Sequence, residues 1–113
     1  MRTAGLLLLL LAISGMARAA SYAVVLKDPP AAERFPSREA LHSAEAREYR
    51  EHLKAEQDRV KRELTRRHIT VTGSTEVLAN AIYIKAAKEQ AEELRHMDGV
   101  KAVTAMRRVR PLK

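Results

Sequence analysis

The chain has 113 residues, with 21 Lys and Arg against 14 Asp and Glu, a net charge of +7 and no cysteine. This length leaves room for one small domain, and the lack of cysteine excludes a disulfide framework. With one Phe and three Tyr, much of the 46% hydrophobic content comes from the N-terminal residues and alanine. A small core and marginal stability are therefore expected.

The N-terminal residues have the pattern of a secretory signal peptide. Arg2 is a basic start, residues 6–13 are an unbroken apolar run, and Ala17-Arg18-Ala19 fits small-x-small cleavage. This run is too short to span a bilayer, which takes ~20 residues. We expect a signal peptide over 1–19, a single domain over 20–113, and a secreted or periplasmic protein. A retained N-terminal membrane anchor is the alternative.

The positive charge collects at the C-terminal end. After Gly99 the chain contains basic residues and no acid, namely Lys101, Arg107, Arg108, Arg110 and Lys113. Residues 107–113 therefore form a basic tail on a domain that is otherwise nearly neutral.

In chain order, the domain is expected to open with a strand, Tyr22–Leu26, which ends at Pro29-Pro30 because proline removes a strand donor. A loop follows over 31–36. Ser37 is then expected to start one helix that continues to about Arg67, since nothing between them breaks a helix. Apolar residues recur there at helical spacing, with Gln57 as a polar gap: Ala46, Tyr49, Leu53, Val60 and Leu64. This predicts an amphipathic helix packed on a sheet.

The second half predicts two strands, a short helix and a last strand. Gly73-Ser74 is expected to start the turn between the two strands, and Gly99 to stop the helix in a left-handed conformation. The expected elements are strand His68–Thr72, strand Ala79–Ala86, helix Lys88–Met97 and strand Val100–Met106.

This order predicts an α+β fold, a ferredoxin-like βαββαβ domain whose four-stranded antiparallel sheet has two helices on one face. Alternation in the third strand separates Ile82 and Ile84 from Tyr83 and Lys85, and we expect the isoleucines to face the helices. In the first and last strands both faces are apolar, so the sequence does not decide which face turns inward. An apolar bare face indicates a partner surface, with tolerated exposure as the alternative.

No catalytic, metal or cofactor site is predicted, and we expect a protein that is not an enzyme. The histidines lack metal-ligand spacing, no serine has a nucleophile-elbow context, and glycine occurs only singly: the histidines are His42, His52, His68 and His96. The basic tail raises the possibility of nucleic acid. The predicted sheet offers Tyr22 and Tyr83 without a base-stacking motif, and export argues against that partner.

Several residues of the second half match, in the same order, a string of residues typical of one protein family. The opening YAVVLKD also fits the first strand of that family. The matching residues of the second half are Asn80, Glu89, Leu94, Gly99, Val100 and Val103. Together with the leader and the element order, this string resembles the subtilisin-propeptide (peptidase inhibitor) family over Ser21 to Leu112. The chain departs from that pattern at Ala81-Ile82, where Gly-Phe is usual, at Ala87-Lys88 and at Met97-Asp98.

The resemblance implies a mechanism. The bare sheet face, including Tyr83 and Lys85, would pack on two surface helices of a subtilisin-like serine protease. The tail residues Arg110, Pro111, Leu112 and Lys113 would lie extended in its substrate cleft. Such a domain acts as an intramolecular chaperone in cis and as a tight, often temporary inhibitor. Arg110 and Lys113 depart from the apolar residues that subtilisins commonly favour there.

Two questions stay open at this point. The sequence does not choose between a free-standing inhibitor and the pro-domain of a longer precursor. The competing class of function is a secreted ferredoxin-like binding module whose basic tail contacts an acidic partner or nucleic acid.

Overall fold

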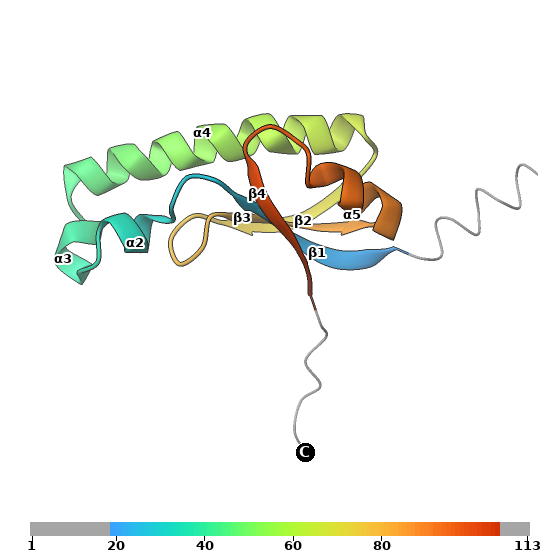
Figure 1. Ribbon diagram of the computed structural model, residues 1–113. Coiled ribbons are helices and arrows are strands. Elements are labelled where there is room, and N and C mark those ends of the chain that lie inside the picture. The colour runs from blue at the N-terminus through green and yellow to red at the C-terminus, as the bar shows by residue number, and fades with distance from the viewer. Residues whose placement is uncertain (1–18, 107–113) are drawn as a thin grey trace, which may run out of the picture.

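A computed structural model describes residues 19–106 (Figure 1). Most of the predicted leader and the whole tail 107–113 therefore lie outside the described residues. The elements are β1 Ala20–Leu26, α2 Ala31–Arg34, α3 Arg38–Leu41, α4 Ala44–Arg66, β2 Thr70–Thr75, β3 Ala81–Ala86, α5 Lys88–Leu94 and β4 Val100–Ala105.

The four strands form one antiparallel sheet in the order β2-β3-β1-β4. Val24 in the central strand β1 pairs with Ile82 of β3 and with Val103 of β4. Directly paired residues share a face, so these three side chains lie on the same side of the sheet. The expected α+β class with a four-stranded antiparallel sheet is confirmed.

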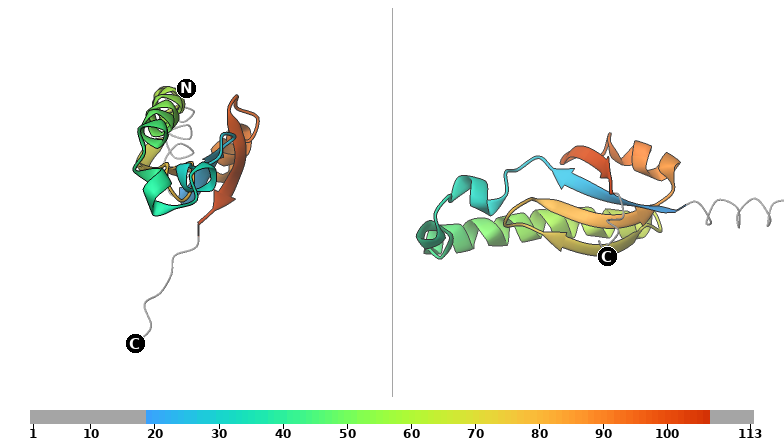
Figure 2. Two further views of the ribbon diagram at one scale, coloured as in Figure 1. Left: turned by 90° about the vertical axis from the view of Figure 1, so that its left-hand side faces the viewer. Right: turned by 90° about the horizontal axis from the view of Figure 1, so that it is seen from below.

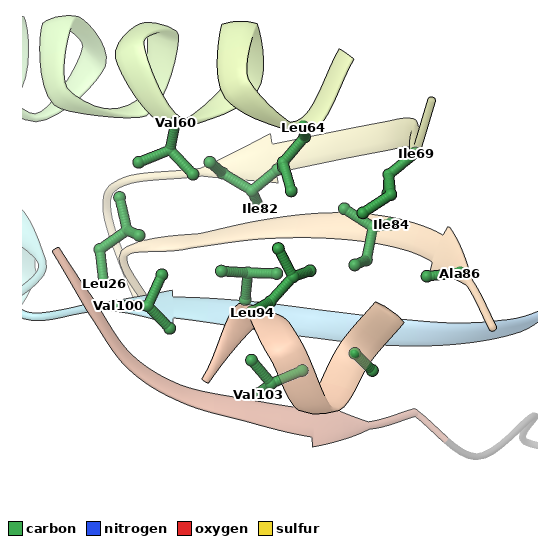
Figure 3. Close-up of a cluster of buried hydrophobic side chains, with 12 residues drawn as sticks. Leu26, Val60, Leu64, Ile69, Ile82, Ile84, Ala86, Leu94, Val100 and Val103 are labelled. Atoms are coloured by element: carbon green, nitrogen blue, oxygen red, sulfur yellow. The ribbon is translucent and has the colours of Figure 1, made fainter. Parts of the chain in front are cut away.

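The helices α4 and α5 lie on that same side, and the core forms beneath them (Figures 1 and 3). Ile82 and Ile84 are fully buried, which confirms that the isoleucines face the helices. Leu94 of α5 and Val60 and Leu64 of α4 join them in one cluster. The predicted apolar stripe of α4 is confirmed at Ala46, Leu53, Val60 and Leu64, whereas Tyr49 is only half-buried and Gln57, expected as a polar gap, is itself buried.

The prediction of one helix from Ser37 to Arg67 is wrong. Ser37 does cap a helix, since its Oγ accepts a hydrogen bond from the Ala40 N–H at 3.0 Å, but that helix is the four-residue α3. A second cap, the Oγ of Ser43, accepts from the Ala46 N–H at 3.1 Å and starts α4. A serine side chain that satisfies an end donor competes with continuing the helix. The expected loop over 31–36 likewise contains α2.

The C-terminal end of α4 explains a second difference. His68 was expected to begin a strand, but its φ of 61° is left-handed. The N–H of Ile69 donates to the Leu64 carbonyl at 2.9 Å, and that of His68 donates to Thr65 at 3.0 Å. This is the Schellman motif, which ends a helix and brings two apolar residues together, here Leu64 and Ile69. The strand therefore starts later, at Thr70.

Two glycines also differ from expectation. Gly73 does not start a turn: it lies inside β2, next to a register shift between Val71 and Gly73. Gly99 has the expected positive φ, 87°, but α5 already ends at Leu94. It lies in the turn into β4 instead, where its carbonyl accepts from the Lys27 N–H at 3.0 Å.

Among the described residues, no helix is both long enough and apolar enough to cross a membrane.

Candidate functional site

The candidate site is the face of the sheet turned away from α4 and α5. Seen from below, none of the described helices lies over it (Figure 2, right). Strand alternation from the inward Val24 and Ile82 places the intervening side chains here. We call this surface the open face, and it comprises Ser21, Ala23, Val25, Thr70, Gly73, Thr75, Ala81, Tyr83, Lys85, Ala102 and Thr104, of which Ala81 is only 2% exposed.

The strand register arranges the open face in rows across the sheet. The middle row runs Gly73, Tyr83, Ala23, Thr104. The row on one side of it joins Thr70, Lys85 and Ser21, and the row on the other side includes Val25 and Ala102. Small side chains prevail, so the floor of this face is shallow and a partner backbone can approach it closely.

Tyr83 is the one aromatic residue of the open face. A Cβ placed on Gly73 would lie 3.7 Å from Tyr83 Cδ2, so the ring covers the neighbouring glycine. An aromatic ring over a cross-strand glycine shields backbone that would otherwise be wet. Tyr83 is half-buried for this reason, although it points away from the core.

An exposed apolar residue stands at one end of the open face. Leu78, in the β2–β3 loop, is 84% exposed. Together with Val25 and Lys101 it lines an open hollow of ≈ 340 Å³. Leu78 does not stand out in the sequence, because an apolar residue in a short loop is not part of a periodic pattern.

A buried polar contact fixes the base of this loop. The Asn80 Nδ2 donates to the Asp28 carbonyl at 3.1 Å, and its Oδ1 accepts from Gln57 Nε2 at 2.9 Å. Its backbone carbonyl accepts from the Leu26 N–H at 2.9 Å. Asn80, one of the residues that carry the family resemblance, is 2% exposed and acts on the fold rather than on the surface.

The predicted surface residues Tyr83 and Lys85 both lie on the open face. The face left undecided for β1 and β4 is now resolved, with Ala23, Val25, Ala102 and Thr104 on the open side. The predicted tail residues Arg110, Pro111, Leu112 and Lys113 lie outside the described residues. The Met106 N–H donates to the Ser21 carbonyl at 2.9 Å, so the described chain leaves the sheet beside the Lys85 row.

Between residues 19 and 106, no group of three or more His, Asp and Glu is placed to hold a metal ion. His52 Nε2 lies 3.1 Å from Asp28 Oδ2, and both side chains are about half exposed, at 54% and 48%. The hollow beside His52 is lined by no Ser, Thr or Cys.

Comparison with known proteins finds no matching family model, no matching curated protein and no matching solved structure.

Proposed function

We propose that the domain is a ferredoxin-like βαββαβ fold whose two helices are α4 and α5. The strand order β2-β3-β1-β4 and the single core shared by both helices support this arrangement. The short helices α2 and α3 then form an insertion in the connection between β1 and α4. They stay close to the body, since the Ala31 and Ala32 N–H groups donate to the carbonyls of Glu76 and Val77 at 2.9 and 2.8 Å.

On this fold we propose an inhibitor and intramolecular chaperone of a subtilisin-like serine protease. The observation that carries the proposal is the open face, a shallow sheet surface of mostly small side chains with no described helix over it. A sheet face of this kind buries its apolar side chains when a second layer packs on it. Subtilisin-like proteases would supply that layer from two surface helices, as the resemblance implies.

The position of β4 supports the second half of the mechanism. β4 is an edge strand that pairs with β1 up to the Met106 N–H, and the basic tail follows directly. Arg110, Pro111, Leu112 and Lys113 are thus joined to the open face by only a few residues. A docked sheet and a tail in the substrate cleft would then act as two linked contacts on one protease, each raising the effective concentration of the other.

The alternative remains a ferredoxin-like binding module that meets an acidic partner or nucleic acid through its tail. The open face supports the first proposal, because a module that binds through its tail alone gives no role to an uncovered sheet face.

The test is to titrate a panel of subtilisin-like proteases with residues 20–113 and with a variant that lacks Val109 to Lys113. The intact domain should inhibit competitively. The shortened domain should stay folded, because the deleted residues lie beyond β4, but it should lose competitive inhibition and retain weaker binding. If the intact domain slows none of the enzymes while the tail binds a nucleic acid or an acidic polymer, the alternative holds.

We also propose export with cleavage after Ala19. The first residue of β1 is Ala20, which pairs with Ala86, so cleavage there would leave the whole strand in the mature chain. N-terminal sequencing of protein exported from a bacterial host should read Ala20-Ser21-Tyr22 or begin one residue later. A mature protein that still contains Arg2 would contradict export by this leader.

A further inference from the structure

The side chain of Leu78 projects into solvent from a loop whose backbone is fixed. Among the described residues only two large apolar side chains are exposed, and Leu78, at 84%, is the more exposed of them. Before Leu78, the carbonyls of Glu76 and Val77 accept hydrogen bonds from N–H groups of α2. After it, the Asn80 carbonyl accepts from the Leu26 N–H at the end of β1. The loop is therefore held on both sides of Leu78, which lowers the cost of ordering it in a contact.

An open hollow of ≈ 340 Å³ lies directly beside this side chain, and we call it the Leu78 hollow. Residues from the end of β1, from α2, from the β2–β3 loop and from the start of β4 line it, at the end of the sheet away from α5 (Figure 1). Its apolar lining includes Val25, Pro29, Pro30 and Ala79. Leu78 does not fill the hollow, since most of its side chain is exposed. An unburied leucine and an apolar hollow therefore lie side by side on one surface.

The charges around the Leu78 hollow are balanced in sign. Its lining contains two lysines and two acids, namely Lys27, Lys101, Asp28 and Glu33. Asp28 is in contact with His52. Among the described residues, the other three have no oppositely charged group within 4.0 Å. The surface therefore presents unpaired charges of both signs around an apolar centre.

From this arrangement we infer that the chain forms a two-fold symmetric dimer through the Leu78 hollow. Each Leu78 packs on the apolar lining of the partner's hollow, and Lys101 of each copy pairs with the partner's Glu33. A two-fold interface brings the same surface of both subunits together, so that surface has to be complementary to itself. A leucine beside an apolar hollow, with unpaired charges of both signs, meets this requirement. A purely basic or purely acidic partner would match only half of these charges.

The first test is sedimentation of residues 20–113, which contain every described helix and strand, at low salt and from micromolar to millimolar concentration. The contact is small, so the dimer should dissociate on dilution, and no larger species should form because a two-fold contact is closed. Leu78→Asp should weaken association at least about tenfold, since it places a carboxylate in each apolar hollow. Leu78→Met is the matched control: it keeps an apolar side chain of similar size and should stay within about threefold of the wild type.

Charge reversal tests the two-fold pairing. Glu33→Lys and Lys101→Glu should each weaken self-association about tenfold at low salt, because each change puts like charges opposite one another at two symmetric positions. An equal mixture of the two variants should associate about as tightly as the wild type. In the mixed pair the unchanged Lys101 of one chain meets the unchanged Glu33 of the other, and the two substituted positions also meet with opposite charges. Lys88→Glu and Glu39→Lys reverse exposed charges outside the hollow and should change association less than about twofold.

A dimer that Leu78→Asp disrupts and that mixing the two charge variants restores supports the inference. A wild type that stays monomeric at millimolar concentration and low salt overturns it. A dimer that is equally tight in Leu78→Asp and Leu78→Met also overturns it, because another surface must then hold the two copies together. Growth into larger species, or a mixture that associates no better than either charge variant alone, overturns the two-fold pairing and the inference with it. None of these results depends on a protease, so the proposed function is tested separately.

Discussion

The side-chain amide of Gln57, in the middle of α4, donates to the side-chain oxygen of Asn80 at 2.9 Å, and both residues are 2% exposed. The same Gln57 nitrogen donates to the Thr75 carbonyl at 2.7 Å. Through Asn80 the contact reaches the Asp28 carbonyl at the end of β1. One buried amide pair therefore ties the long helix to the ends of three strands and fixes the position of the helix along the sheet.

The first prediction concerns this pair. Gln57→Leu should lower the free energy of unfolding by about 1–3 kcal/mol, because Asn80 Oδ1 then stays buried without its donor. Urea unfolding measures the loss, and a double-mutant cycle with Asn80→Ala isolates the coupling. Coupling above about 0.5 kcal/mol is expected. A cycle that closes with no coupling would mean that the contact only fills space.

The regular parts of the fold were predictable because their signals are local. The helical spacing of Leu53, Val60 and Leu64 marks the buried stripe of α4, and alternation in β3 marks Ile82 and Ile84. The break before α4 was not predictable in the same way. Several positions there can begin a helix, and the choice of Ser43 depends on how α2 and α3 pack back against α4.

The second prediction concerns the left-handed residue that ends α4. His68→Gly should raise the free energy of unfolding by about 0.5–1 kcal/mol, because glycine adopts a positive φ without the steric cost that a side chain imposes. The urea midpoint should therefore increase. His96→Gly is the matched control, an exposed histidine whose φ is not positive, and it should give no gain. Equal shifts in both variants would contradict the argument.

The third prediction concerns the core under α5. Leu94 is fully buried, and Leu94→Ala should cost about 2–5 kcal/mol through lost burial and the cavity left behind. A small domain with few aromatic residues has little stability to lose, so the variant should be largely unfolded by circular dichroism. Leu78→Ala removes the same atoms from an exposed position, and its free energy of unfolding should stay within about 0.5 kcal/mol of that of the wild type.

The candidate site was predictable only in part. Tyr83 and Lys85 follow from the alternation of β3, where one face is strongly apolar. In β1 and β4 both faces are apolar, so the outward position of Val25 is set by its pairing with Ala81 and Ala102, which are distant in sequence. Contacts between residues that are distant in sequence produce no local pattern. For the same reason the sequence does not indicate that Lys101 lies beside Leu78.

The last prediction tests whether the open face is a binding surface. Tyr83→Asp would place a carboxylate in the apolar middle row, where a docked partner would leave it desolvated and unpaired. We expect affinity for a subtilisin-like protease to fall at least about tenfold, a loss of roughly 1.4 kcal/mol or more. The measurement is the inhibition constant, taken together with a urea melt, because the Tyr83 ring also covers Gly73.

Two further variants keep this result interpretable. Ala55→Asp adds the same charge to the exposed side of α4, in the other layer, and should leave inhibition unchanged. Tyr83→Phe keeps the ring over Gly73 and should inhibit nearly as well as the wild type. If Tyr83→Asp is folded and inhibits as strongly as Tyr83→Phe, the sheet does not dock through this face. Any inhibition would then have to come from the tail alone, and deleting Val109 to Lys113 would remove all binding rather than part of it.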